Sequence, residues 1–211
     1  MSAFTLHDRR HSPAAERNGP PILAELQRLL PATGVMLEIA SGTGQHAACF
    51  SEGLPGWTWQ PSDAEPGALP SIAAWCQDLP RVRAPLLLDV LAETWPGVPA
   101  HVDAIYCANM IHIAPWECTA GLMQGAARHL APQSLLVTYG PYLVDDEDTA
   151  PSNLAFDADL RARNAGWGIR RLADVEEKAA SVGLRLQQRL DMPANNKLLA
   201  WALAGEVRLT L

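Results

Sequence analysis

A glycine turn between an apolar run and a helix-like segment is the feature that most constrains this chain. The run Leu37–Ile39 passes through Ala40–Gly44 into a segment that starts at Gln45. Glycine has no Cβ, so the backbone of such a turn can approach a ligand closely, and the first N–H groups of the next helix are free to donate to it. The turn therefore predicts a strand–loop–helix unit that binds a small molecule through its backbone.

Strand-like and helix-like segments alternate beyond this turn, which is the pattern of parallel βαβ units. The expected strands are Val35–Ala40, Trp57–Ser62, Pro85–Leu88, Val102–Ala108, Ser134–Tyr139, Arg185–Leu190 and Leu198–Leu203. The expected helices between and after them are Gln45–Glu52, Ala68–Leu79, Trp116–Leu130 and Leu172–Val182. The turn between the last two strands is too short for a crossover helix, so that pair must be antiparallel. The sequence predicts an α/β fold with a seven-stranded mixed sheet and helices on both faces.

The N-terminal residues are polar and carry no periodic pattern. A helix is expected from Pro20 to Leu30, with proline at its start, where no N–H is needed. A chain of 211 residues fits one domain. We therefore expect residues 1–19 to form an arm and residues 20–211 to form a single domain.

Three acids end successive strand-like runs: Glu38, Asp63 and Asp89. In open α/β sheets the ligand lies beyond the carboxyl ends of the strands. A carboxylate at Asp63 can accept bonds from both hydroxyls of a ribose, and one at Asp89 can accept from an exocyclic amine. Each acid alone is equally well explained as a helix cap or a strand-end turn. Together, behind a glycine turn, they favour an adenosine site.

A nicotinamide-dependent oxidoreductase remains an alternative. The run Gly42–Ala47 also fits the dinucleotide pattern G-x-G-x-x-A, with Asp63 about 20 residues further on. Glu38 before the turn and the antiparallel C-terminal pair count against it. Neither Tyr139 nor Tyr142 is followed four residues later by the lysine that a tyrosine-based hydride-transfer site would use.

Composition argues against several classes of partner. The net charge is -7 and no basic run exceeds two residues, so a nucleic-acid partner is not expected. No run approaches the roughly 20 apolar residues that span a bilayer, and the N-terminus lacks the apolar core of a secretion signal. Four scattered cysteines suit a reducing compartment, and dispersed histidines give no metal site. We expect a cytoplasmic protein with no membrane partner.

The segment Glu38–Gly44 resembles the first motif of class I methyltransferases, E/D-x-G-x-G-x-G, with Ala40 in place of the first glycine. More narrowly, the chain is similar to a methyltransferase-like family of unknown function marked by LEIxSGTGQH, WQPSD and MPANN. Those motifs, with two further ones, occur here at Leu37–His46, Trp59–Asp63, Asn109–Glu117, Ser152–Asn164 and Met192–Asn196. The resemblance implies the Rossmann-like class I methyltransferase fold and S-adenosylmethionine as the cofactor. It does not name a methyl acceptor.

The expected cofactor-binding residues come from the turn, the strand ends and this resemblance. They are Glu38, Ala40, Ser41, Gly42, Gly44, Asp63, Asp89 and Asn109. Because Ala40 departs from the motif and no catalytic base is unambiguous, a non-catalytic cofactor-binding partner subunit stays open as an alternative function.

Methyl transfer requires an aligned acceptor and, for some acceptors, a group that removes a proton. His112 is the best candidate base, since the unperturbed pKa of histidine is about 6.5. Its neighbours Ile111 and Ile113 slightly favour the alternative, a histidine bonded in or near the core. Asn109 and Tyr139, at the ends of two strands, complete the expected catalytic set.

The acceptor is expected to be a small molecule, because the chain is acidic and offers no basic binding surface. The expected substrate-binding residues are Arg17, Asn18, Tyr142, Arg163, Asn195 and Asn196. The family pattern S-P-A-A-E-R-N is present at Ser12–Asn18, and it implies that residues 1–19 act as a lid over the cofactor. The atom methylated and the oligomeric state do not follow from the sequence.

Overall fold

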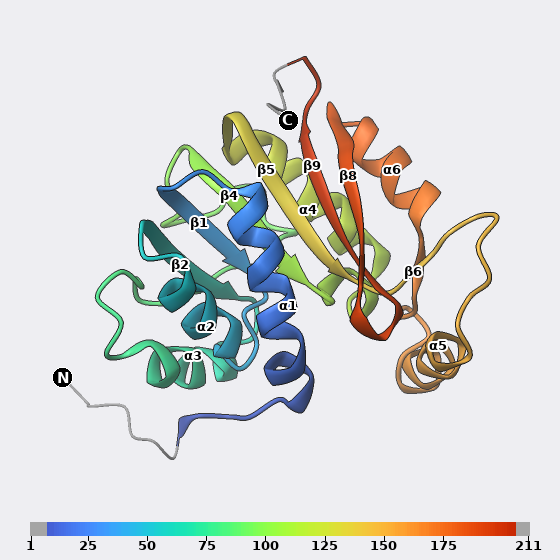
Figure 1. The fold of residues 1–211 in the computed structure, drawn as a ribbon, viewed down its shortest axis with the longest axis horizontal. Helices are drawn as coiled ribbons and strands as arrows, with labels where there is room; N and C mark the ends of the chain where they lie inside the picture. The colour runs from blue at the N-terminus through green and yellow to red at the C-terminus, as the bar shows by residue number, and fades with distance from the viewer. Residues whose placement is uncertain (1–7, 206–211) are drawn as a thin grey trace.

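Seven strands form one mixed sheet in the computed structural model, which describes residues 8–205 (Figure 1). In sheet order they are β3 (Leu86–Leu87), β2 (Trp57–Asp63), β1 (Gly34–Ile39), β4 (Val102–Ala108), β5 (Leu130–Gly140), β9 (Asn196–Leu203) and β8 (Leu184–Met192). The strands from β1 to β5 are parallel, and β9 runs antiparallel to both β5 and β8. The predicted mixed sheet and its C-terminal antiparallel pair are confirmed.

Helices cover both faces of this sheet (Figure 1). One face carries α1 (Pro13–Leu29), α2 (Gln45–Gly53) and α3 (Leu69–Cys76), and the other carries α4 (Trp116–His129) and α6 (Leu172–Ala180). On the first face Ile22 and Phe50 belong to one hydrophobic cluster with Trp59 and Tyr139. On the second face Leu122 belongs to another hydrophobic cluster, which includes Ile105 and Trp201. Burial of these aliphatic and aromatic side chains on both faces holds the strands of the central sheet in place.

The first helix begins seven residues earlier than the sequence predicts, at Pro13 rather than Pro20. Ser12 is its N-cap, and the Ser12 hydroxyl accepts from the N–H of Ala15 at 3.2 Å. Pro20 and Pro21 lie inside the helix, where each removes one intrahelical N–H bond. Packing of α1 against α2 and burial of Ile22 compensate for those losses. The predicted division at residue 20 therefore falls within a helix, and residues 1–7 of the predicted arm lie outside the described residues.

An excursion follows β5 at the carboxyl edge of the sheet. It contains α5 (Pro151–Arg163) and a two-stranded parallel sheet of β6 (Tyr142–Leu143) and β7 (Arg170–Arg171). The short 3₁₀ helices η2 (Pro66–Ala68), η3 (Met110–His112) and η4 (Pro193–Asn195) also lie in loops beyond strand ends. Helix α5 lies beside the turn between β8 and β9 (Figure 1), where Asn153 donates to the Asn195 carbonyl at 3.0 Å. This segment therefore adds a helix and a small sheet beyond the carboxyl edge of the main sheet.

All four cysteines are free thiols. Within residues 8–205, no helix is both long and apolar enough to cross a membrane.

Candidate cofactor and acceptor site

The strand order brings the predicted site residues to one edge of the sheet. The parallel strands β1, β2, β4 and β5 end there, and the antiparallel strand β9 begins there. As a result the glycine turn, Asp63, Asn109, Tyr139 and Asn196 share this edge although they are far apart in the sequence. The chain reverses its direction of strand addition between β1 and β4, which is the place where open α/β sheets bind ligands.

The glycine turn adopts left-handed backbone conformations at three positions. The φ angles are 55° at Ala40, 59° at Gly42 and 91° at Gly44. A Cβ on Gly44 would lie 2.6 Å from the Cα of Ile72, so this position excludes a side chain. A Cβ on Gly42 would meet only the Ala40 carbonyl oxygen, at 4.0 Å, and the space above it is open. The turn therefore has the open backbone cradle that a nucleoside cofactor requires.

Ser41 and Glu38 tie this turn to the neighbouring strand β2. The Ser41 N–H donates to the Ser62 carbonyl at 2.9 Å, and the Ser62 N–H donates to the Ser41 hydroxyl at 3.2 Å. Below them the Glu38 carboxyl accepts from the indole N–H of Trp59 at 2.6 Å. Burial raises the pKa of Glu38 to about 7, against the opposing effect of the Trp59 hydrogen bond. Glu38 lies beneath the turn, with its contacts inside the protein.

Asp63 closes the turn from the end of β2. One carboxylate oxygen accepts from the N–H of Gly42 at 2.8 Å, and the other accepts from the N–H of Glu65 at 2.9 Å. Each oxygen keeps a second lone pair for a further donor. Asp89 is exposed and accepts from the N–H of Leu91 at 2.9 Å, which is the strand-end turn weighed as its alternative explanation. Both carboxylates follow strands of the same edge.

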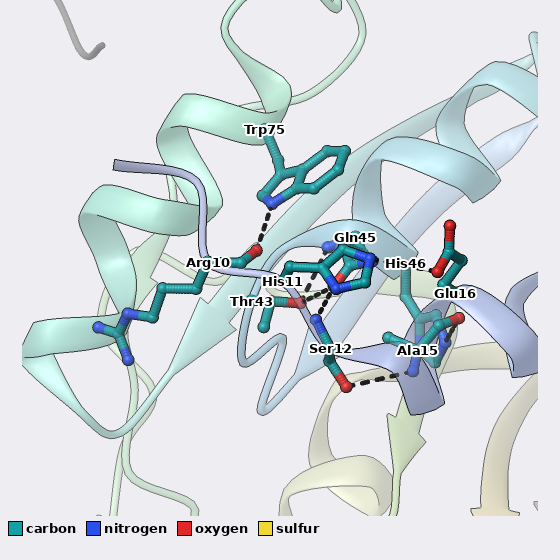
Figure 2. Close-up of polar contacts among 9 residues, drawn as sticks. All are labelled: Arg10, His11, Ser12, Ala15, Glu16, Thr43, Gln45, His46 and Trp75. Atoms are coloured by element: carbon teal, nitrogen blue, oxygen red, sulfur yellow. Dashed lines mark hydrogen bonds and ion pairs between the residues drawn. The ribbon is translucent and has the colours of Figure 1, made fainter. Parts of the chain in front are cut away.

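The segment Arg9–Ser12, here called the N-terminal strap, crosses the start of α2 (Figure 2). The Ser12 N–H donates to the Gln45 side chain at 2.5 Å, and the indole of Trp75 donates to the Arg10 carbonyl at 2.8 Å. The Arg10 N–H donates to the Ser71 hydroxyl at 2.8 Å, and that hydroxyl donates to the Thr43 carbonyl at 2.7 Å. The strap is thus bonded to the helix and to the turn that would hold the cofactor.

Five of the predicted residues line one pocket of about 560 Å³. They are Arg17, Asn18, Asn109, Arg163 and Asn196. Apolar side chains complete its wall, chiefly Ile113, Phe156, Leu160 and Trp167. The pocket opens between α1 and α5, beside the carboxyl ends of β4 and β5. It gathers the five predicted residues from four separate segments of the sequence.

Two side chains that line this pocket, the amides of Asn18 and Asn109, have no hydrogen-bond partner among the described residues. The hydroxyl of Tyr139, at the end of β5, is buried and makes no well-formed hydrogen bond within residues 8–205. Burial raises the pKa of Tyr139, while the Asn196 side chain and the charge of Arg17 lower it in part. Buried polar groups are almost always hydrogen-bonded, and exceptions call for an explanation such as a ligand.

His112 lies next to this pocket but has no exposed surface. Its Nδ1 accepts from the Arg170 N–H at 3.4 Å, while Nε2 has no partner in the described chain. Burial and the charge of Arg170 lower its pKa to about 3. A Cβ on Gly140 would lie 2.6 Å from Nε2 and 3.1 Å from Oδ1 of Asn109, so both side chains lie close to the backbone of Gly140, and this position excludes a side chain. The ring is neutral near pH 7 and matches the core histidine weighed from the sequence.

Tyr142 and Asn195 face elsewhere. Both line a second pocket of about 310 Å³, which shares Asn153 and Asn196 with the first. The Tyr142 hydroxyl is buried and donates to the Thr138 hydroxyl at 3.0 Å. The residues that the sequence grouped as one substrate set are therefore divided between two adjoining pockets.

Sequence reasoning missed four residues of this region: Gln45, Ser71, Trp75 and Gly140. The first three bond to the strap, and such contacts between distant segments leave no local pattern. Gly140 could have been found from the sequence, because a glycine at the end of a strand often marks a place where a ligand or another part of the chain approaches the backbone closely.

The strand order and the edge geometry together define the fold. A sheet in the order 3-2-1-4-5 with a final antiparallel pair, a glycine turn after its first strand and acids after the next two is the Rossmann-like fold that class I methyltransferases have. The chain itself belongs to the family described as "Protein of unknown function (DUF938)", whose model matches residues 9–203.

Solved structures that are similar to this chain include methyltransferases, all at low sequence identity. The mitomycin 7-O-methyltransferase MmcR has a TM-score of 0.79 and 16% identity, over 94% of this chain and 57% of that one. The pyocyanin biosynthetic protein PhzM has a TM-score of 0.74 and 19% identity, over 96% of this chain and 62% of that one. Human N-acetylserotonin methyltransferase, in complex with SAM, has a TM-score of 0.73 and 14% identity, over 90% and 52%. This chain thus spans little more than half the length of these proteins, and the likeness establishes the fold.

Proposed function

We propose that this protein is an S-adenosylmethionine-dependent methyltransferase that acts on a small-molecule acceptor. The observation that carries the proposal is the adjacency of two features at one sheet edge. An open glycine turn closed by Asp63 shares the carboxyl edge of the sheet with a pocket whose Asn18 and Asn109 side chains lack partners among the described residues. One feature fits a nucleoside and the other fits a second, polar molecule beside it.

Each part of the turn has a role in holding the cofactor. The backbone from Ala40 to Gly44 would support the cofactor, and Asp63 would accept from its ribose hydroxyls with the lone pairs that Gly42 and Glu65 leave free. Asp89 would accept from the exocyclic amine of the base, and Asn109 would bind the methionine end. Glu38 and Ser41 hold the turn against β2, so we assign Glu38 a positioning role.

When bound, S-adenosylmethionine supplies a methyl group already activated on a sulfonium sulfur. The protein then has to align the acceptor with that methyl and exclude competing water. Asn109 lines the acceptor pocket and can hydrogen-bond polar atoms of the acceptor, and Tyr139 lies at the end of the neighbouring strand β5. Because burial raises the pKa of Tyr139, its hydroxyl stays protonated and donates a hydrogen bond near pH 7.

Some acceptors need a group that removes a proton, and His112 is the candidate for it. His112 Nε2 lies beside Asn109 across Gly140, which is the position expected of a base. Its pKa of about 3 makes it a weak one in the described conformation. An acceptor that enters as an anion needs no base, and His112 then only supports the floor of the pocket.

The neighbouring structures support the choice of acceptor class. Two of them are a mitomycin 7-O-methyltransferase and a pyocyanin biosynthetic protein, and both names refer to small-molecule chemistry. The sites of those proteins are not carried over residue by residue, because sequence identity is below 20%. Cytoplasmic location and the lack of a nucleic-acid partner remain predictions from composition.

Isothermal titration of the purified protein tests the cofactor assignment. We expect saturable, one-to-one binding of S-adenosylhomocysteine and no binding of NADH or NADPH run in parallel. Binding of a nicotinamide cofactor alone would favour the oxidoreductase alternative. Binding of neither would contradict the proposal.

A non-catalytic cofactor-binding subunit is the second candidate function. Ala40 in the left-handed region and the depressed pKa of His112 favour it, since an active site would be expected to carry glycine and a usable base. A screen of small-molecule acceptors with radiolabelled S-adenosylmethionine separates the two, because only a methyltransferase transfers the label.

A further inference from the structure

We propose that the acceptor pocket takes a small molecule with an anionic group on a flat apolar body, and that Arg17 binds the anion. This inference rests on the proposed function, because it names the substrate class of the same site. The pocket is the one between α1 and α5 that contains Asn18, Asn109 and Asn196.

The charge of the pocket wall selects an anion. The charged side chains that line it are Arg17 and Arg163, and none of the described lining residues carries a carboxylate. The protein as a whole has a net charge of -7, so an all-positive wall departs from the rest of the molecule. Complementary charge in a concave site steers and orders an anionic ligand.

Arg17 is the arginine with a free guanidinium. It forms no hydrogen bond or ion pair with any residue in the described part of the chain. Arg163 is already engaged: its guanidinium lies 3.6 Å from the Asp159 carboxylate and 5.2 Å from the centre of the Trp167 ring. An incoming anion therefore finds its strongest unpaired positive charge at Arg17.

Neutral donors beside Arg17 complete the anion site. The side-chain amides of Asn18 and Asn109 line the same pocket as Arg17, and neither has a hydrogen-bond partner within residues 8–205. Asn196 lines the pocket as well. An anion bound at Arg17 could therefore accept further hydrogen bonds from these amides.

The other side of the pocket is built for an apolar body. Ile113 and Phe156 are 43% and 38% exposed, which is unusual for large apolar side chains, and both line the pocket with Leu160. The Arg163–Trp167 pair adds a flat surface. A planar ring placed there would cover exposed apolar area and stack on that surface.

A pair of probes that differ only in charge tests the inference. Titrations of 2-naphthoate and of 2-naphthamide are carried out with and without saturating S-adenosylhomocysteine. We expect the wild-type protein to bind naphthoate at least about tenfold more tightly than naphthamide, since charged hydrogen bonds typically contribute 1.5–3 kcal/mol. Equal affinities, or no binding of either probe, would overturn the proposal.

Two arginine variants on the same helix complete the design. Arg17→Gln should abolish the preference for naphthoate and leave naphthamide binding unchanged. Arg28→Gln is the matched control, because Arg28 is an exposed residue of α1 that pairs with Glu25 and lies outside the pocket. Its preference for naphthoate should equal that of the wild type.

The affinity for S-adenosylhomocysteine distinguishes the remaining outcomes. If Arg17→Gln weakens that affinity and keeps the naphthoate preference, Arg17 serves the methionine carboxylate and the inference is wrong. If the wild type binds no S-adenosylhomocysteine but prefers naphthoate through Arg17, the proposed function fails while the anion site stands.

Discussion

The carboxylate of Asp63 accepts a hydrogen bond from the backbone N–H of Gly42 at 2.8 Å. The acid that ends the second strand therefore holds the turn that follows the first. The other carboxylate oxygen of Asp63 accepts from the backbone N–H of Glu65. A single side chain therefore holds both the glycine turn and the loop that follows β2.

Replacing Asp63 by alanine should weaken both binding and folding. We expect affinity for S-adenosylhomocysteine to fall by about 1–3 kcal/mol, because ribose hydroxyls lose a charged acceptor, and the unfolding free energy to fall by about 1–3 kcal/mol. Titration calorimetry and urea unfolding measure the two. Asp103→Ala is the control: its carboxylate accepts from the Val35 N–H at 2.7 Å, at the opposite end of β1. That variant should lose stability only, and unaltered affinity in Asp63→Ala would remove Asp63 from the site.

Ala40→Gly should stabilise the protein or leave its stability unchanged. Alanine in the left-handed region costs roughly 1–2 kcal/mol, and glycine avoids this cost while losing more chain entropy on folding. Ala158→Gly, an exposed position within α5, should instead destabilise by about 1 kcal/mol. Denaturant unfolding of both variants provides the comparison. Equal losses at the two positions would show that the backbone of Ala40 is unstrained in solution.

Glu38 makes stability depend on pH in the direction opposite to most carboxyl groups. Its folded pKa of about 7 lies above the ordinary value of 4.5, so the folded state binds the proton more tightly. Its contribution to stability is present below pH 4.5 and is lost as the pH rises to about 7. Glu38→Gln should therefore raise the unfolding free energy at pH 8 relative to wild type and change it little at pH 4.5. A lower stability of the variant at pH 8 would contradict this.

His112 acts in the other direction, since its folded pKa is lowered to about 3 and the unfolded chain binds the proton first. Protonation of the unfolded state should reduce stability as the pH falls from about 6.5 towards 3, by up to about 2 kcal/mol between pH 7 and pH 5. His112→Asn should show a smaller loss over that interval, measured by urea unfolding at both pH values. Once an acceptor is identified, kcat and the cofactor affinity of this variant can also be measured. If His112 is a catalytic base, its replacement should lower kcat and leave the cofactor affinity unchanged.

The N-terminal strap should become more accessible when its anchor is removed. Ser71→Ala loses the bonds to the Arg10 N–H and the Thr43 carbonyl, so trypsin should cleave after Arg10 faster than in wild type. If the strap closes over the cofactor, S-adenosylhomocysteine slows this cleavage in both proteins. Ser181→Ala, whose exposed hydroxyl bonds only within its own turn, should leave the rate unchanged. Mass spectrometry of the released fragment follows the reaction, and a rate insensitive to the cofactor would argue against a lid.

The parts of the fold that sequence reasoning predicted are those with long periodic signals. Apolar runs broken by acids revealed the parallel strands, and the short turn before Asn196 required the antiparallel pair. Pro20 and Pro21 were read as a helix start because proline is common there, whereas packing against α2 keeps the helix continuous from Pro13. The strands Tyr142–Leu143 and Arg170–Arg171 were missed, since two residues carry no periodicity.

The site residues, like the elements of the fold, could be predicted only in part from the sequence. Residues at strand ends, such as Asp63 and Asn109, were placed at the correct edge because topology alone determines it. Side chains in the connecting segments depend on how those segments turn, and Tyr142 accordingly faces the smaller pocket. The bonds of Gln45 and Ser71 to the strap join segments far apart in the chain, and no local pattern predicts them.

Helix α1 has a consequence for the order in which ligands bind. Its N-cap, Ser12, is bonded to Gln45 at the start of α2, and the next turn of the same helix presents Arg17 and Asn18 to the acceptor pocket. If cofactor binding at the glycine turn shifted α1, the side chains of Arg17 and Asn18 in the acceptor pocket would move with the helix. The two affinities should then be linked, each ligand changing the Kd of the other by the same factor. Such reciprocity would favour an ordered kinetic scheme in which the acceptor enters a pocket already shaped by the cofactor.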